Sequence, residues 1–527
     1  MTNIFNNLNN IITPKLLHFF IAIIVAVLTT GFLRLQLFSG FPESDGGLNT
    51  FINQYIYYAL NNSQSLKAMT VNLYQLMTHW VYALDVHQFI VLRLIDGLLA
   101  IIVSIILFKV ILKESDSILF TIILMIPLLI LMNNVLVIGY GYKNSIWAAY
   151  LPLFTALLIW QKSSKEDTFS FYIIGALVSF GVLLREPFLP FFLLAGVAIF
   201  TSYGWRVLLK YLIGSAILGF SVLAVLLSFR GWDLLDLIDS YTNLTGGLGK
   251  FHSQIWDMFF NSSLRSLKAN WFICITALAS IIYFIKLYAA DKKSVCMNRF
   301  YFWLLVALIP LIEPMVKVGF EYHLANCLPG LAGLSAMSWR YINNNESKQA
   351  NTLSLLILGL MSLFVIVPSV NQTIVKSGKI YSPSDAIYWS KNEVFRSSVL
   401  VQRSQYLNIA AEIYERSREG STLVITNSLH VLYPLTGLLP PVYELSSLNP
   451  LYSRLNQDEE KLIKIIKKHR PTIIATPPSE EIPEWQKDFS EIIEKTNLYN
   501  KVAVIPKNLA INYGWRSVII YRLKDFK

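Results

Sequence analysis

The sequence is poor in charge. Only 15% of its 527 residues are Asp, Glu, Lys or Arg, whereas 54% are hydrophobic, and the mean hydropathy is +0.50. A water-soluble domain does not contain so large a share of apolar residues. The composition therefore excludes a chain that is water-soluble over its whole length. We therefore expect a protein that crosses a membrane several times.

The sequence also lacks the motifs of several functional classes. It has no Gly-rich phosphate-binding loop and no Lys of the Walker type, so nothing indicates a pump driven by a nucleotide. We find no internal repeat or inverted pair of halves, which disfavours a transporter. The three cysteines, Cys274, Cys296 and Cys327, have neither metal-binding nor redox spacing. The net charge of +11 is better explained by loops that face anionic lipid than by nucleic acid, which we do not expect as a partner.

Long apolar runs are abundant. About eleven of them approach the roughly 20 residues that cross a bilayer, although several are short. Lys and Arg recur in alternate loops, which places the amino terminus in the cytoplasm and the carboxyl terminus outside. The predicted spans lie near residues 16–38, 89–112, 117–137, 146–161, 169–184, 187–202, 207–229, 270–289, 300–316, 324–339 and 352–369.

Two segments outside the spans are predicted to have structure of their own. In the first outer segment, residues 39–88, the stretches 49–60 and 66–84 are amphipathic and carry aromatic residues, which favours helices at the bilayer interface. After about residue 370, charged residues become frequent and helix and strand patterns alternate, which predicts a small α/β domain on the outer face. The fold class is therefore mainly α: a polytopic helical membrane bundle at 1–370 and an outer α/β domain at 371–527. Within that domain we expect helices at 406–418 and 458–468 and strands at 423–426, 472–475, 502–505 and 517–523.

The acidic pair Glu43 and Asp45 follows directly on the first apolar run. The Pro and Gly residues of segment 41–47 predict a break in the helix, so both carboxylates should lie outside a helix at the membrane surface. A carboxylate near a hydroxyl can act as a general base, and a pair can hold a divalent cation such as Mg²⁺ or Mn²⁺. The alternative is a solvated loop that only joins two helices.

Further polar residues gather on the same predicted face of the membrane. Their side chains could hold a phosphate or pyrophosphate through charge-assisted hydrogen bonds, or the cations could snorkel at helix ends. Asp96 lies inside the second predicted span and needs a partner, for which Arg93 on the same helix face is the candidate. The residues of this group are Arg93, Lys143, Arg185, Lys317, Glu321, Tyr322 and His323.

The order of these motifs resembles that of a known family. The acidic segment is followed by an amphipathic outer segment, by Phe89–Leu94 and Leu183–Pro187, by Glu321–Leu331 before a span, and by an outer α/β domain. This layout, over essentially the whole chain, is similar to that of the C-type (GT-C) membrane glycosyltransferase superfamily. That superfamily includes the protein O-mannosyltransferases and the aminoarabinose transferases that modify lipid A. The sequence departs from it in the loop Gly139–Asn144, where many members carry a second Asp and this chain carries none.

The resemblance implies a helical membrane bundle and a donor sugar carried on polyprenyl phosphate. The acid after the first span acts as base or metal ligand in the family, which corresponds to Asp45, with Glu43 as its partner. Phosphate binding then falls to Arg185 and His323. The further candidates, chosen from the residues themselves, are Lys143 and Lys317 for the phosphate and Arg93, Glu321 and Tyr322 for the substrate.

The sequence thus predicts a glycosyltransferase of a bacterial cytoplasmic membrane that is active on the outer face. It would move a sugar from a polyprenyl-phosphate carrier to a lipid, glycan or protein acceptor. Three alternatives remain open. They are a glycan polymerase or ligase with a lipid-diphosphate donor, a transporter of lipid-linked glycans, and an assembly factor whose outer domain binds partners.

Overall fold

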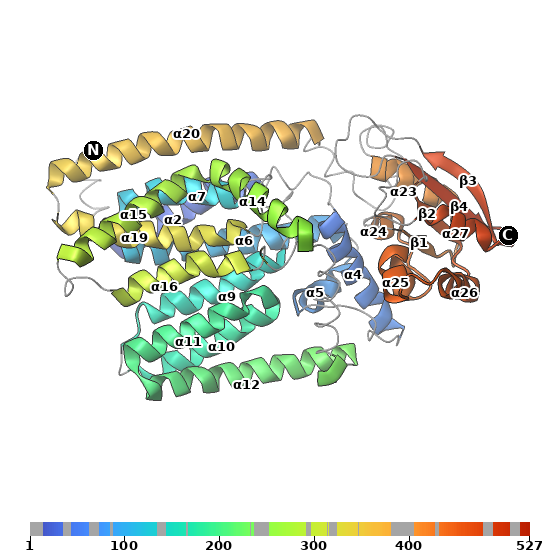
Figure 1. Cartoon of the computed structure of the whole chain (residues 1–527), viewed down its shortest axis with the longest axis horizontal. Helices are drawn as coiled ribbons and strands as arrows, with labels where there is room; N and C mark the ends of the chain where they lie inside the picture. Colours follow the sequence, from blue (N-terminus) through green and yellow to red (C-terminus); the bar gives the residue numbers. More distant parts are fainter. Residues whose placement is uncertain are drawn as a thin grey trace. The chain divides into compact units, whose positions relative to one another are not determined.

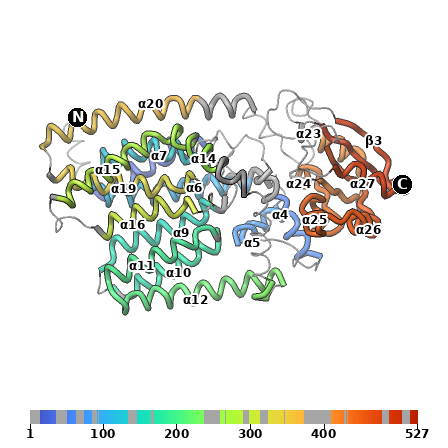
Figure 2. Tube along the Cα trace, viewed as in Figure 1, coloured from blue at the N-terminus to red at the C-terminus, as the bar shows by residue number. Residues whose placement is uncertain are grey.

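The fold is known from a computed structural model, which is mostly helical (Figures 1 and 2). Its contacts divide the chain into two compact units. Unit 1 consists of Met1–Phe38, Asn72–Tyr74 and Arg93–Lys379, and unit 2 of Ser39–Val71, Gln75–Leu92 and Ile380–Lys527. The structure describes residues 14–34, 44–62, 73–84, 88–133, 144–164, 167–231, 233–236, 252–290, 297–312, 315, 324–345, 347–380, 405–426, 430, 432–477, 488–505 and 517–526.

Unit 1 is built from helices. Five stretches are long and apolar enough to cross a membrane, namely Pro14–Arg34, Leu94–Ser115, Trp205–Arg230, Trp271–Ala289 and Lys348–Asn371, and five further apolar helices are shorter. The described elements of unit 1 are α2 (Pro14–Ala26), the π-helical turn η1 (Val27–Gly31), α6 (Gln88–Ser115), α7 (Ile118–Met132), α9 (Asn144–Trp160), α10 (Thr168–Leu184), η3 (Glu186–Phe188), α11 (Leu189–Tyr203), α12 (Trp205–Arg230), α14 (His252–Ala269), α15 (Trp271–Ala290), α16 (Met297–Leu308), η5 (Ile309–Leu311), η6 (Ala325–Cys327), α19 (Leu328–Asn345) and α20 (Lys348–Ile380).

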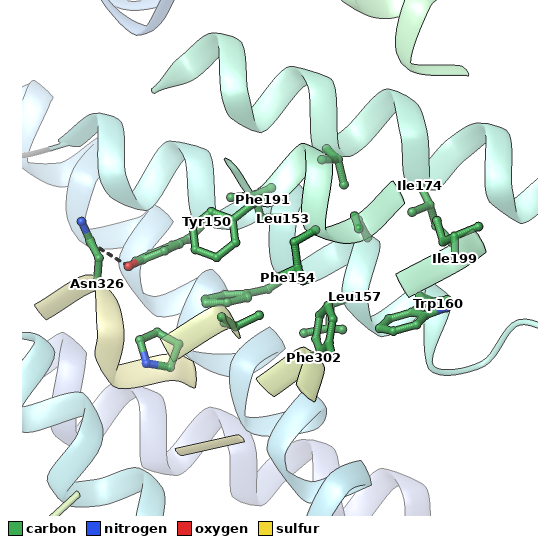
Figure 3. Close-up of a pocket in the computed structure, with 16 residues that line it drawn as sticks. Tyr150, Leu153, Phe154, Leu157, Trp160, Ile174, Phe191, Ile199, Phe302 and Asn326 are labelled. Atoms are coloured by element: carbon green, nitrogen blue, oxygen red, sulfur yellow. Dashed lines mark hydrogen bonds between the residues drawn. The ribbon is translucent and has the colours of Figure 1, made fainter. Parts of the chain in front are cut away.

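These helices agree with the prediction of a membrane protein, whereas the count of eleven spans and their orientation stay predictions. Glycines let some of the helices pack closely, as is common in membrane bundles. A Cβ at Gly214 of α12 would collide with the carbonyl oxygen of Tyr172 in α10, and a Cβ at Gly333 of α19 would collide with the ring of Trp303 in α16. An apolar cavity lies between α9, α10, α11 and α16 (Figure 3).

Unit 2 contains a four-stranded mixed sheet. Its strands are β1 (Leu423–Ile425), β2 (Ile473–Thr476), β3 (Tyr499–Ile505) and β4 (Val518–Leu523), in the order β1-β2-β4-β3, and they overlap the four predicted strands. β1 and β2 are parallel, with Leu423 opposite Ile473, and the other two pairs are antiparallel. The described helices that belong to this sheet domain are α23 (Gln405–Glu415), α24 (Leu432–Thr436), η7 (Tyr443–Ser446), α25 (Leu448–Arg454), α26 (Glu459–His469) and α27 (Ser490–Lys495).

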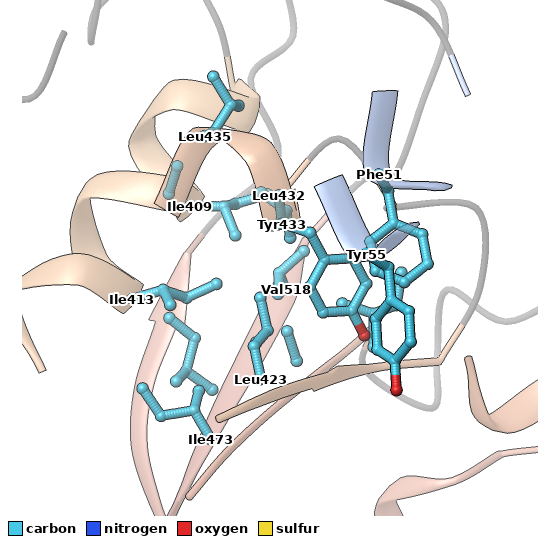
Figure 4. Packing of buried hydrophobic residues seen from close by; sticks show 14 of the residues in the cluster. Phe51, Tyr55, Ile409, Ile413, Leu423, Leu432, Tyr433, Leu435, Ile473 and Val518 are labelled. Carbon is cyan, nitrogen blue, oxygen red and sulfur yellow. The ribbon is translucent and has the colours of Figure 1, made fainter. Parts of the chain in front are cut away.

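Unit 2 also includes the first predicted outer segment, which forms α4 (Ser44–Asn61), α5 (Leu73–Thr78) and η2 (His79–Ala83). We predicted that the aromatic residues of the first helix face the bilayer interface. Instead Phe51 and Tyr55 are buried in a core with Tyr433 of α24 and Leu423 of β1 (Figure 4). The ring of Phe51 stacks on that of Tyr433 with 4.3 Å between the centroids. One face of the sheet is therefore completed by a helix more than 350 positions earlier in the chain.

The contact units do not follow a single boundary. Residues 39–71 and 75–92 group with the sheet, although the sequence placed them with the transmembrane domain. Near the carboxyl-terminal side the division at Lys379/Ile380 lies close to the predicted boundary at residue 370. The division into a transmembrane domain at 1–370 and an outer domain at 371–527 stays a prediction.

Candidate functional site

Few of the predicted site residues have a described side chain. Arg185 is described, whereas for Asp45 and Arg93 the structure places only the backbone, in α4 and α6. Asp45, Gly46 and Gly47 lie in the first turn of α4, so the prediction that this segment stays outside a helix is wrong for them. The reason is that the pair of glycines sits at a helix start, where their helix-breaking effect is small. Glu43, Lys143, Lys317, Glu321, Tyr322 and His323 lie outside the described residues.

Arg185 is half-buried at the carboxyl-terminal end of α10, where it is the C-cap residue. Its backbone is extended there, and its N–H still donates to the carbonyl oxygens of Gly181 and Val182. A cation at this position is favoured by the helix dipole. The guanidinium lies over the ring of Phe188, with 5.7 Å between Cζ and the ring centroid. Arg185 is thus held beside an aromatic side chain at the end of α10.

An aromatic row continues from Phe188 into α9. Phe188 stacks on Tyr150 at 5.4 Å, and Tyr150 meets Trp147 edge to face at 6.2 Å. The hydroxyl of Tyr150 donates to Asn326 Oδ1 at 2.7 Å. Among the described residues, the buried Nδ2 of Asn326 has no hydrogen-bond partner. The middle of the row, at Tyr150, is therefore bonded to an amide group that still has donor capacity.

A buried ion pair lies at the other end of the row. Arg34 Nη1 donates to Asp96 Oδ2 at 2.7 Å, and Arg34 Nε donates to Asn133 Oδ1 at 2.7 Å. The guanidinium also lies 5.1 Å from the ring centroid of Trp147. Asn133 in turn donates to Thr30 of the π-helical turn η1. Charges inside a membrane bundle need such partners, because an unpaired charge there is costly.

The sequence analysis did not name Arg34 as a partner of Asp96. We expected Arg93 because it lies three residues before Asp96 on one helix, but its side chain lies outside the described residues, so that pairing stays a prediction. Arg34 lies within the first predicted span and is 62 residues away from Asp96 in the sequence. Helix packing brings these two charges together, and a rule based on spacing within one helix cannot detect this.

The cavity of unit 1 begins beside Tyr150 and Asn326. It is partly open to the outside, and nearly all of its lining is apolar. Figure 3 shows Tyr150 and Asn326 at one side and Trp160 and Ile199 at the other. The lining residues are Tyr150, Leu153, Phe154, Ala156, Leu157, Trp160, Ile174, Val178, Phe191, Leu194, Ala195, Ile199, Phe302, Val306, Asn326 and Pro329. Such a chamber suits an apolar chain with a polar end.

No metal centre is seen within the described part of the chain. There, no three His, Cys, Asp or Glu side chains come together in a group that could hold an ion. Glu43 and the side chain of Asp45 lie outside that part. The predicted divalent cation at these two residues therefore stays a prediction.

Comparisons with known proteins assign neither a family nor a function to the chain. No family model matches the chain, and no curated protein is similar to it. The resemblance to the C-type glycosyltransferases therefore stays a prediction that rests on the motifs of the sequence.

The structure adds residues to the site that the sequence analysis missed. Tyr150 and Asn326 line the cavity. Trp147 contacts Tyr150 on the side away from Phe188, and the guanidinium of Arg34 lies over the ring of Trp147. Asn326 is part of the motif Glu321–Leu331 and stands out as an amide in an apolar segment, which was a signal. Arg34, a cation at the end of the first apolar run, was another. Tyr150 had none, because a single Tyr in an apolar run is common.

Proposed function

We propose that this protein is a glycosyltransferase that moves a sugar from a polyprenyl-phosphate carrier to a lipid, glycan or protein acceptor. The observation that supports this most is the apolar cavity of unit 1 with its polar side at Tyr150 and Asn326. A polyprenyl phosphate is a long apolar chain with one anionic end, so its chemistry matches such a lining.

The donor phosphate is proposed to bind beside the aromatic row. The Nδ2 group of Asn326 is a donor without a described partner, and Arg185 adds a guanidinium that suits phosphate geometry. Arg34 has a different role, because Asp96 and Asn133 already accept its hydrogen bonds and it supports Trp147. Lys143, Lys317 and His323 remain proposed phosphate contacts, and Arg93, Glu321 and Tyr322 remain proposed substrate contacts.

The proposed reaction is a substitution at the anomeric carbon. The acceptor hydroxyl oxygen forms the new bond to this carbon, the bond to the phosphate oxygen breaks, and polyprenyl phosphate leaves with the electron pair. Asp45 takes the hydroxyl proton as general base, with Glu43 as its partner. Their carboxylate oxygens are of the type that Mg²⁺ and Mn²⁺ bind, and such an ion would neutralise phosphate charge.

The proposal includes a location. It assumes about eleven spans, an amino terminus in the cytoplasm of a bacterium, and the sheet domain on the outer face of the cytoplasmic membrane. Lys and Arg in alternate loops support this orientation. Polyprenyl-phosphate sugars and the acceptor would then meet on the outer face of the cytoplasmic membrane, and the lipid-linked donor would replace a nucleotide sugar there.

The test is transfer of labelled sugar from a panel of polyprenyl-phosphate sugars by the purified protein in lipid. Ala195→Phe fills the cavity and should raise the KM for the donor about tenfold or more, a loss of about 1.4 kcal/mol of binding. Ala198→Phe is the matched control, since it makes the same change on α11 outside the cavity lining and should leave the KM within about twofold.

Asp45→Asn tests the base separately. It should abolish transfer while donor binding is kept, because only the proton acceptor is lost. Failure to release sugar from any monophosphate donor would reject the proposal. Transfer from lipid-diphosphate donors alone would favour the polymerase or ligase function instead.

A further inference from the structure

A cluster of basic side chains lies at the ends of four helices in unit 1. We call it the basic cluster, and it consists of Lys113, Lys162, Arg299 and Arg340. Lys113 lies in the last turn of α6, Lys162 just after α9, Arg299 in the first turn of α16 and Arg340 near the end of α19. Lys162 is exposed and the other three are half-buried, so all four can be reached from outside.

The basic cluster is built on a buried glutamate. Glu114 is only 2% exposed, and its Oε1 accepts from Arg299 Nη2 at 2.9 Å and from Gln161 Nε2. Lys113 Nζ donates to the backbone oxygen of the same Gln161. A cation in the first turn of a helix is opposed by the helix dipole, so Arg299 needs this carboxylate. These contacts hold Arg299 and Lys113 in place beside Glu114.

The cluster has more positive charge than this frame balances. Lys113 is near enough to Lys162, Arg299 and Arg340 for repulsion, and Glu114 supplies the attraction that offsets it in part. Within the described residues, Lys162 and Arg340 have no ion pair. Cations that a fold holds together in this way raise the local potential and favour a bound anion.

The surroundings indicate which anion. Lys113 and Glu114 lie in the last turn of the candidate span Leu94–Ser115, which is the level at which lipid headgroups lie. Aromatic rings adjoin the cations. Trp160 lies two residues before Lys162, and Phe302 lies one turn beyond Arg299. The centroids of these two rings are 4.8 Å apart. A ligand with a phosphate and an acyl chain fits both features.

We propose that the basic cluster binds the phosphate of an anionic phospholipid, whose acyl chain lies along Trp160 and Phe302. The phosphate site uses residues other than Tyr150, Asn326 and Arg185, and phospholipid binding does not depend on the proposed transferase activity. Trp160 and Phe302 also line the cavity, so only the acyl-chain part of this site adjoins the proposed donor site. Binding of an anionic phospholipid at the basic cluster would make the stability of unit 1 depend on the lipid headgroup. The alternative is that the cations only interact with the dipoles at the carboxyl-terminal ends of α6, α9 and α19. In that case they would stabilise the helices equally in any lipid.

The test compares the full chain in nanodiscs of phosphatidylcholine with and without phosphatidylglycerol. Thermal unfolding should occur several degrees higher with phosphatidylglycerol, since a ligand that binds only the folded state stabilises it. The double variant Lys162→Gln, Arg340→Gln should lose at least half of this shift and retain less phosphatidylglycerol in native mass spectrometry. These side chains are not buried and have no described ion pair, so the variant should fold.

The matched control is Arg206→Gln, Lys210→Gln, which removes the same charge from the start of α12. It should keep the full shift. If both double variants lost the shift equally, net charge alone would explain the effect and the proposal would be overturned. A wild-type protein that shows no shift with phosphatidylglycerol would overturn it as well. Inorganic phosphate added to phosphatidylcholine nanodiscs should change nothing, and if it reproduced the shift, a soluble anion would replace the lipid as the ligand.

Discussion

Units 1 and 2 place their apolar and polar residues in opposite ways. In unit 1 large apolar side chains such as Leu356, Leu360 and Phe364 of α20 are exposed, while Arg34 and Asp96 are buried. In unit 2 both faces of the sheet carry apolar cores. Lipid removes the hydrophobic drive between helices, so polar pairs and close contacts select the arrangement in unit 1, whereas burial of apolar surface from water stabilises unit 2.

The largest effect should come from breaking the ion pair of unit 1. Asp96→Ala removes the described carboxylate partner of the buried Arg34, which should cost about 3–5 kcal/mol. Thermal unfolding in detergent should show the loss. The double variant Arg34→Met, Asp96→Leu should recover most of it, because it removes both charges together. Equal losses in single and double variants would mean that the pair does not act as a unit.

Breaking the apolar core of unit 2 should have a slightly smaller effect. Phe51→Ala removes a fully buried ring between Tyr433 and Tyr55 and should cost about 3 kcal/mol. Hydrogen exchange should then speed up in both α4 and β1, since they share this core. Tyr58→Ala on the same helix removes a ring that is 38% exposed and should cost less than about 1 kcal/mol. Similar exchange in the two variants would contradict the packing of α4 on the sheet.

A change of pH should weaken unit 2 through His430. Burial lowers the pKa of this imidazole to about 4, and its ring lies 5.6 Å from that of Phe51. The unfolded chain binds the proton near pH 6.5 and the folded chain only near 4, so stability falls as the pH drops through this window and levels off below it. The loss should reach about 2 kcal/mol.

Denaturant unfolding of the full chain between pH 7 and 4.5 measures this loss. The variant His430→Phe keeps a ring in the core and has no proton to bind, so most of the pH dependence in this window should disappear. If it stays the same, carboxylates rather than His430 are responsible.

The smallest effect should come from an ion pair at the surface of unit 2. Arg470 and Asp525 are 3.0 Å apart, with side chains that are 48% and 77% exposed. Asp525→Asn should cost less than about 1 kcal/mol, because water screens both charges. The cost should shrink further in high salt. A loss of stability as large as that of Asp96→Ala would show that burial does not determine how much these ion pairs contribute to the free energy of unfolding.

Local patterns predicted much of unit 2 but little of the candidate site. The strands and the helix that begins after Asp458 were found because hydropathy and charge patterns are local properties. In the structure the side chain of Asp458 caps this helix by accepting from Lys461 N–H. Arg185 was found because a cation at the end of an apolar run is conspicuous. Tyr150 became a candidate only when Asn326, 176 residues later, was seen to accept its hydrogen bond.

The sequence by itself determined that this chain has membrane-crossing helices and a small sheet, because hydropathy and its period act over a few turns. It did not determine which residues meet. The pairing of Arg34 with Asp96, the docking of α4 on the sheet, the cavity beside Tyr150 and the basic cluster around Glu114 were decided by tertiary structure. Each joins residues far apart in the chain, and their contact depends on the packing of whole helices, which no local pattern encodes.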